Sequence, residues 1–225
     1  MIRDEVKEQH QKLEGKTFNE KVQYFWYYYK VHVFATLFAV IALSLFISAV
    51  LKDSKEPSIY VALINSNLAS EQDTTLLRDY VISREIDTEE HPAKMDFTLH
   101  MSSDSVDDAS MASSQKYMSM LSTGKADIIL CDKWIIDEYA ILDAYENLET
   151  YLKPEDYEKI KDKLYYCEVN GKGKIPVAFY TTNVDKVLTD SLYGKKECPL
   201  IAICRTSKRK EAAADFIHYL LESGK

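Results

Sequence analysis

The chain has 225 residues, 46% of them hydrophobic and 28% charged, and its low glycine and proline content argues against a fibrous or disordered chain. The formal net charge of −8 is unevenly distributed, since residues 1–51 carry six basic and five acidic side chains and residues 52–225 carry 22 and 31. An acidic C-terminal part is a poor partner for polyanions, so nucleic acid is not expected as a partner.

Residues 1–23 are a polar segment that is too short to be a domain, and we expect it to be helical and cytoplasmic. Residues 31–51 (VHVFATLFAVIALSLFISAVL) contain no formal charge. A helix needs about 20 apolar residues to cross a bilayer, so residues 24–51 are predicted to hold an aromatic belt and a transmembrane helix. The apolar region of a signal peptide is only about 7–15 residues long, so a retained anchor is favoured over the alternative of a cleaved signal.

Residues 24–30 (YFWYYYK) place six aromatic side chains in a row before a lysine. A helix or strand in a soluble core shows only part of its circumference to that core, so it cannot bury six consecutive rings. Tyrosine and tryptophan prefer the headgroup layer of a membrane, which surrounds a helix on every side. The predicted membrane-interface residues are Tyr24, Phe25, Trp26, Tyr27, Tyr28, Tyr29 and Lys30. A docking surface for a neighbouring helix is the alternative.

Basic residues flank the apolar stretch unequally. Lys12, Lys16, Lys21 and Lys30 precede it, whereas only Lys52 and Lys55 follow it within a similar distance. Because cytoplasmic flanks carry the excess of lysine and arginine, the N-terminus is predicted to lie in the cytoplasm. The chain is then a single-pass protein of the cell membrane, with a linker over 52–57 and an extracellular α/β domain over 58–225.

The extracellular part begins with an unbroken apolar run, Ile59 to Ile64, which predicts a strand buried on both faces as in a parallel sheet. A helix over 69–84, a strand over 94–101, a helix over 107–124 and a strand over 125–132 are predicted to follow. We expect Met111, Met118 and Leu121 to share one face of the second helix, and Gly124 to end it. This order indicates a βαβαβ unit with right-handed crossovers.

The rest of the chain is less regular. Its predicted elements are short helices broken near Asp143, a helix that starts at Pro154, a hairpin turn over 170–174, an apolar stretch over 175–180, a helix over 183–194, a strand over 198–206 and an amphipathic helix over 207–223. The predicted fold class is α/β: one transmembrane helix followed by a three-layer αβα lobe with a mostly parallel sheet.

No catalytic residue, cofactor or metal site is predicted, and the chain is not expected to be an enzyme. His91, His100 and His218 lie far apart in the sequence, and none has a partner at metal-ligand spacing. Cys131, Cys167, Cys198 and Cys204 all lie in the part expected outside the cell, where disulfides are permitted. Three pairings and the absence of any disulfide remain open, although Cys131 and Cys204 sit in apolar runs typical of a core.

Polar residues follow the predicted strands. In open α/β sheets ligands bind beyond the carboxyl ends of the strands, and short polar side chains with one aromatic ring suit binding better than catalysis. The alternative is that these strand ends are polar only because they face solvent. The candidate ligand-binding residues are Asn65, Ser66, Asn67, Ser102, Ser103, Asp132, Trp134 and Thr181.

Three segments resemble bacterial extracellular solute-binding proteins of the type II periplasmic-binding kind. They are residues 126–152 (ADIILCDKWIIDEYAILDAYENLETYL), 175–183 (IPVAFYTTN) and 198–223 (CPLIAICRTSKRKEAAADFIHYLLES). The resemblance covers about residues 58–222 and implies a lobe that captures solutes for uptake. Full members have two lobes, so the resemblance implies a form shortened to about one lobe. Residues 24–34 (YFWYYYKVHVF) also resemble the start of small membrane proteins of Gram-positive bacteria.

The function expected from these observations is that of a membrane-anchored, non-enzymatic, solute-binding-like protein. It would present or sense a small solute beside a transporter. The alternative is a degenerate lobe that serves as an interaction or scaffold module in a membrane complex. The expected partners are the lipid bilayer, a small solute and a membrane protein.

Overall fold

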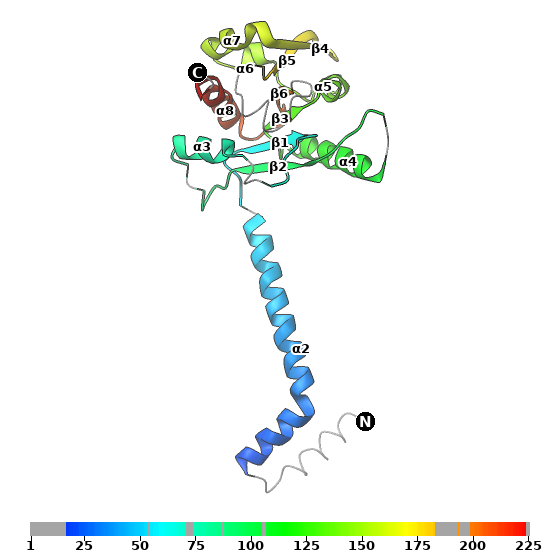
Figure 1. The fold of residues 1–225 in the computed structure, drawn as a ribbon, viewed down its shortest axis with the longest axis vertical. Helices are drawn as coiled ribbons and strands as arrows, with labels where there is room; N and C mark the ends of the chain where they lie inside the picture. The colour runs from blue at the N-terminus through cyan, green and yellow to red at the C-terminus, as the bar shows by residue number, and fades with distance from the viewer. Residues whose placement is uncertain are drawn as a thin grey trace. The chain divides into compact units, whose positions relative to one another are not determined.

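The computed structural model describes residues 17–53, 55–70, 74–86, 88–104, 107–182, 193 and 199–223. The contacts divide the chain into two compact units, Met1–Lys55 and Glu56–Lys225 (Figure 1). Most of the segment expected to be helical over 1–23, and nearly all of the helix expected over 183–194, lie outside the described residues.

The first unit contains one long helix, α2 (Phe18–Asp53). Its apolar part, Tyr29–Ser48, is long enough and apolar enough to cross a membrane, a property that it shares with a signal sequence near an N-terminus. The helix has no break at residue 24, and it continues to Asp53. The helical backbone thus extends two residues past Leu51, into the start of the segment predicted as a linker.

The second unit contains a six-stranded sheet with the order β2-β1-β3-β6-β5-β4. Its strands are β1 (Tyr60–Ile64), β2 (Lys94–Leu99), β3 (Ile128–Cys131), β4 (Leu164–Val169), β5 (Gly173–Tyr180) and β6 (Leu200–Ile203). β1 runs parallel to β2 and β3, whereas the pairs β3–β6, β6–β5 and β5–β4 are antiparallel.

The sheet is therefore mixed, and the expectation of a mostly parallel sheet is wrong. The predicted turn over 170–174 joins β4 and β5 as a hairpin, and a hairpin of this length makes its two strands antiparallel. β6 then returns beside β3 in the opposite direction. An apolar run predicts burial but carries no information about strand direction.

Helices cover both faces of the sheet (Figure 1). One face packs against α3 (Leu76–Ser83), α6 (Leu148–Tyr151), α7 (Pro154–Ile160) and α8 (Lys210–Ser223). The other packs against α4 (Asp108–Thr123) and α5 (Lys133–Ala140). A short 3-10 helix, η2 (Lys161–Lys163), leads into β4.

Alternate residues of the central strands supply these two hydrophobic layers, as the pleat of a strand requires. Val61, Leu63 and Ile128 belong to the first layer, and Ala62 and Ile129 belong to the second. Both layers lie entirely within Glu56–Lys225, so this unit contains the core that it needs to fold without the first unit.

The helix over 107–124 was predicted almost to its ends. The side chain of Asp107 accepts a hydrogen bond from the Ser110 N–H at 2.7 Å, and Gly124 ends the helix with a φ of +66°. The expected shared face is wrong for Leu121, because Met111 and Met118 are 48% and 44% exposed whereas Leu121 is buried. The helix instead buries Ser110, Tyr117, Met120 and Leu121 against the sheet.

Candidate functional site

The chain leaves β1 and β3 toward opposite faces of the sheet. α3 follows β1 on one face, and α5 follows β3 on the other. Such a divergence between adjacent parallel strands is where open α/β proteins bind ligands. The carboxyl ends of β1 and β3 therefore form the candidate site, as the sequence predicts.

Asn65 ties three strand ends together at this position. Its side-chain amide donates to Asp132 Oδ2 at 2.7 Å, and its Oδ1 accepts from the Met101 N–H at 2.8 Å. Its own N–H donates to the Leu99 carbonyl at 2.9 Å. Asn65 has a φ of +61°, in the left-handed region that asparagine tolerates better than most residues. Two of the predicted residues, Asn65 and Asp132, are thus brought into direct contact.

Ser66 lies next to this contact and is only 5% exposed. Its hydroxyl is buried and has no hydrogen-bond partner among the described residues. Leaving a buried hydroxyl unpaired costs about 1–3 kcal/mol, so such groups are uncommon in folded proteins. Asn67, the next predicted residue, is exposed.

Ser102 and Ser103 lie on the exposed turn that leads from β2 into α4. The Ser102 N–H donates to Ser110 Oγ at 3.0 Å, and the Ser102 hydroxyl accepts from the Asp104 N–H at 3.2 Å. These bonds hold the turn against the first turn of α4. Both serines are exposed to solvent, as the alternative of solvent-facing strand ends expects.

Trp134 and Thr181 have structural contacts. Trp134 is half-buried on α5 and packs against the layer beneath α4 and α5. Thr181 is fully buried, and its hydroxyl donates to the Pro199 carbonyl at 3.1 Å. Thr181 lies at the same edge of the sheet as Asp132, because Tyr180 and Cys131 both pair with Leu200.

Tyr193 covers part of the candidate site and was missed by sequence reasoning. Its ring is buried in the layer beneath α3 and α8, and its hydroxyl donates to the Leu130 carbonyl at 2.8 Å. Burial raises the pKa of the Tyr193 phenol well above its ordinary value, so the group acts as a neutral donor. A single tyrosine in a polar segment gives no periodic signal that would have revealed this position.

A second buried polar group lies at the opposite edge of the sheet. Asp127 is fully buried, and its carboxylate accepts from the Tyr60 N–H at 2.7 Å, from the Ser207 hydroxyl at 2.6 Å and from Arg209 Nε at 2.8 Å. Because its bonds are all made within the protein, Asp127 fastens β1, β3 and the start of α8 together. It is a structural residue that the sequence did not reveal.

Two hollows lie away from the strand ends. One, of about 350 Å³, is lined mainly by apolar residues of α3 and β2, including Leu77, Val81 and Met95. The other, of about 640 Å³, is polar and is lined by Lys172, Arg205 and Lys210 among others. Each of these three cations pairs with a carboxylate, either Asp143 or Glu146, so none of the described cations of the hollow is unpaired.

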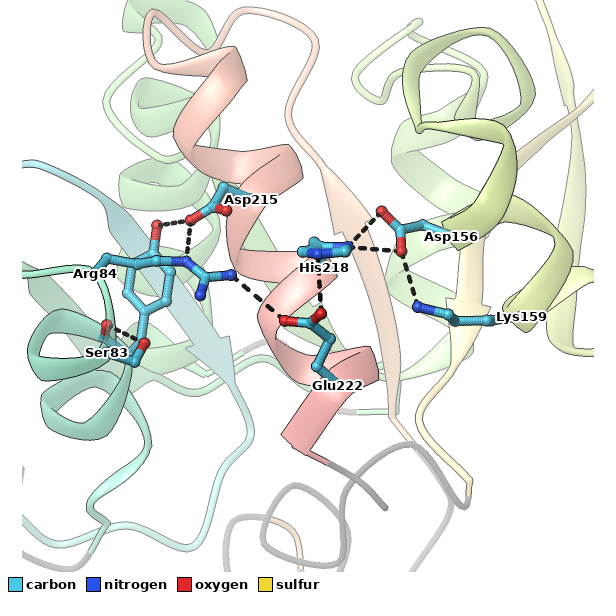
Figure 2. Close-up of polar contacts among 8 residues, drawn as sticks. Ser83, Arg84, Asp156, Lys159, Asp215, His218 and Glu222 are labelled. Carbon is cyan, nitrogen blue, oxygen red and sulfur yellow. Dashed lines mark hydrogen bonds and ion pairs between the residues drawn. The ribbon is translucent and has the colours of Figure 1, made fainter.

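A belt of charged side chains crosses the outer surface of α8. Figure 2 shows Asp215, His218 and Glu222 along one side of α8, with Arg84 approaching from the end of α3 and Asp156 and Lys159 from α7. Arg84 Nε lies 2.9 Å from Asp215 Oδ2, and His218 Nδ1 lies 2.8 Å from Asp156 Oδ1. The belt therefore links three helices that share one face of the sheet.

The predicted membrane-interface residues all lie in α2. Trp26, Tyr27 and Lys30 are exposed, and Trp26 makes an edge-to-face contact with Phe34 at a centroid distance of 5.8 Å. Lys30 Nζ lies 6.0 Å from the centre of the Tyr27 ring. The side chains of Tyr24, Phe25 and Tyr28 lie outside the described residues.

The three described cysteines, Cys131, Cys167 and Cys204, are buried and free. Burial raises the pKa of each thiol, and nearby Asp137 adds to the effect at Cys167, whose pKa is about 12. Cys198 lies outside the described residues.

Comparison of the chain with protein-family models, with curated proteins and with solved structures found no match.

Proposed function

We propose that the chain is a membrane-anchored, non-enzymatic binding protein whose extracellular domain is a periplasmic-binding-like lobe. It binds a small solute at the carboxyl ends of β1 and β3. The lobe presents or senses this solute beside a membrane-protein partner, such as a transporter.

The buried hydroxyl of Ser66 is the observation that carries this proposal. It lies without a partner among the described residues, beside the Asn65–Asp132 contact, at the point where ligands bind in open α/β sheets. A ligand with a hydrogen-bonding group would pair this hydroxyl and remove its desolvation cost. Asp132 adds a carboxylate, so the site favours a neutral or cationic solute over an anion.

Support for a membrane anchor comes from α2. Phe34, Phe38 and Phe46 are well exposed in a helix whose apolar part covers Tyr29–Ser48. Exposing such side chains to water costs free energy, whereas a bilayer core accommodates them. The aromatic run before this stretch would then lie in the headgroup layer and set the depth of the helix.

The solute is sought with the fragment Glu56–Lys225, screened by thermal shift against amino acids, amines, sugars and peptides. A solute that binds only the native state raises the melting temperature. Ser66→Ala should abolish this shift while leaving the ligand-free melting temperature unchanged or slightly higher, because it removes an unpaired buried hydroxyl. Ser119→Ala, on the exposed side of α4, is the matched control and should keep the shift. If no compound of the panel raises the melting temperature, the proposal is overturned.

One observation favours the alternative, an interaction module in a membrane complex. Met111 and Met118 are exposed on α4 about two helical turns apart, and exposed methionines are common on adaptable binding surfaces. In that case a membrane-protein partner should co-purify with the full chain in detergent. The double substitution Met111→Glu and Met118→Glu should release the partner, whereas Ser66→Ala should retain it.

A further inference from the structure

His218 is held between two carboxylates from two helices. Its Nδ1 faces both oxygens of Asp156, at 2.8 and 2.9 Å, and its Nε2 lies 3.2 Å from Glu222 Oε1 (Figure 2). Asp156 belongs to α7, and His218 and Glu222 lie four residues apart on α8. The two carboxylates thus lie on opposite sides of the ring, with Nδ1 directed at Asp156 and Nε2 facing Glu222.

Asp156 is an unusual position for a carboxylate, because it is only 2% exposed. A buried carboxylate needs a compensating positive charge. A positive charge is supplied by Lys159, whose Nζ lies 3.3 Å from Asp156 Oδ1 and whose side chain is 40% exposed. Glu155 adds a third carboxylate. One of its oxygens lies within 4.8 Å of a carboxylate oxygen of Asp156 and of a ring nitrogen of His218.

We propose that Glu155, Asp156 and His218 form a binding site for a divalent transition-metal ion, with Zn²⁺ as the best fit. Imidazole nitrogen and carboxylate oxygen are both zinc ligands, and water would complete a tetrahedron. Ca²⁺ and Mg²⁺ prefer oxygen ligands alone, so they should bind poorly. Glu222 then has the role of the outer carboxylate that orients a metal-binding histidine.

The geometry needs only small adjustments. Ligand atoms of a tetrahedral zinc ion lie about 3.4 Å apart, so the oxygen of Glu155 must move inward from a separation of up to 4.8 Å. The contact between His218 Nδ1 and Asp156 must widen slightly to admit the ion. Lys159 has a flexible stem and an exposed end, so it can withdraw into solvent.

No metal site is predicted from the sequence, because Asp156 and His218 are 62 positions apart and lie on helices that meet only in the fold. The site is also separate from the strand ends where the solute is proposed to bind. Success or failure of either proposal therefore leaves the other standing.

The test is calorimetric titration of the fragment Glu56–Lys225 with Zn²⁺, Ca²⁺ and Mg²⁺. We expect one Zn²⁺ per chain and no heat from Ca²⁺ or Mg²⁺. Substituting Co²⁺ for Zn²⁺ should give a visible absorption spectrum typical of four-coordinate nitrogen and oxygen ligands.

Variants separate metal binding from the ion pairs of the belt. Glu155→Gln removes one ligand but no ion pair or hydrogen bond that the structure gives the belt. It should therefore weaken Zn²⁺ binding by about 10-fold or more while leaving the metal-free melting temperature unchanged. Glu158→Gln, an exposed neighbour on α7, is the matched control and should bind like the wild type. His218→Gln should abolish binding.

Absence of Zn²⁺ binding to the wild-type fragment would overturn the proposal. So would a Glu155→Gln variant that binds Zn²⁺ as tightly as the wild type, because the ion would then lie elsewhere. His100→Gln excludes a separate surface histidine as the source of the heat, and loss of binding in that variant would also count against the site.

Discussion

The side-chain amide of Asn65 donates a hydrogen bond of 2.7 Å to Asp132, which joins the residue after β1 to the residue after β3. These two strands are parallel neighbours whose helices depart to opposite faces of the sheet. The bond therefore joins the two strand ends at the point where the chain diverges, and Ser66 with its buried hydroxyl is the residue that follows Asn65.

Replacing Asn65 should destabilise the domain in a way that depends on the new residue. Asn65→Ala loses two side-chain hydrogen bonds and leaves a β-carbon at a φ of +61°, so we expect a loss of about 2–3 kcal/mol. Asn65→Gly loses the same bonds without the backbone strain, and it should be more stable than the alanine variant by about 1 kcal/mol. Urea unfolding of Glu56–Lys225 measures both. Equal stabilities would show that the left-handed conformation carries no cost.

Gly124 should tolerate no side chain. It ends α4 with a φ of +66°, and an added Cβ would collide with the carbonyl oxygen of Thr206. The carbonyl oxygen belongs to the backbone and cannot move at little cost, so Gly124→Ala should cost at least about 2 kcal/mol. Gly171→Ala is the matched control, because Gly171 has a φ of +76° but no atom within 4 Å of the added Cβ. Its cost should be about 1 kcal/mol, and a cost as large as that of Gly124→Ala would contradict the steric explanation.

The domain should lose stability in acid, because Asp96 stabilises it only while its carboxyl is ionised. Burial alone would raise the pKa of its carboxyl, but hydrogen bonds from Lys116 and Thr98 outweigh burial and lower that pKa below its ordinary value. A lowered native pKa gives stability that is complete above the unfolded pKa of about 3.9 and is lost as the pH falls through the native pKa. The free-energy difference between wild type and Asp96→Asn should therefore be larger at pH 7 than at pH 3.

The control for this prediction removes the counter-charge. In a Lys116→Gln background the effect of Asp96→Asn should change less between pH 7 and pH 3. If the free-energy difference between wild type and Asp96→Asn is the same at pH 7 and pH 3, another carboxyl governs the acid response.

The parts of the fold predicted from the sequence are those governed by local pattern. The apolar run Ile59–Ile64 predicted a strand buried on both faces, and that strand is β1. Gly124 predicted the end of α4, and the turn over 170–174 predicted a hairpin. The directions of β5 and β6 depend on which strands become neighbours, and no residue within those strands encodes this.

The candidate site divides in the same way. Asn65 and Asp132 each follow a strand, so parallel pairing of β1 with β3 was enough to bring them together. Asp127 and Arg209 are 82 positions apart, and their contact depends on β6 lying beside β3. Tyr193 bonds to the Leu130 carbonyl of β3 from 63 positions away. Such long-range contacts become visible only once the sheet order is known.

The described cysteines should be inert in the folded domain. Cys131, Cys167 and Cys204 are buried, and their thiols have raised pKa values, about 12 for Cys167. The thiolate is the reactive form, so almost none is present at pH 8. In a Cys198→Ser variant, iodoacetamide should label no thiol in the native protein and three in the unfolded protein, as intact mass will show. Rapid native labelling of Cys167 would mean that β4, the edge strand, opens easily.

The orientation of the chain in the membrane can be tested with single new cysteines on either side of the apolar stretch. Thr17 and Lys55 are exposed and flank it, and the excess of lysine before the stretch predicts a cytoplasmic N-terminus. In the Cys198→Ser background, a membrane-impermeant maleimide should label Lys55→Cys on intact cells and should label Thr17→Cys only after the cells are permeabilised. The reverse pattern would invert the topology. A mature chain that lacks α2 and appears in the medium would instead identify the helix as a cleaved signal sequence.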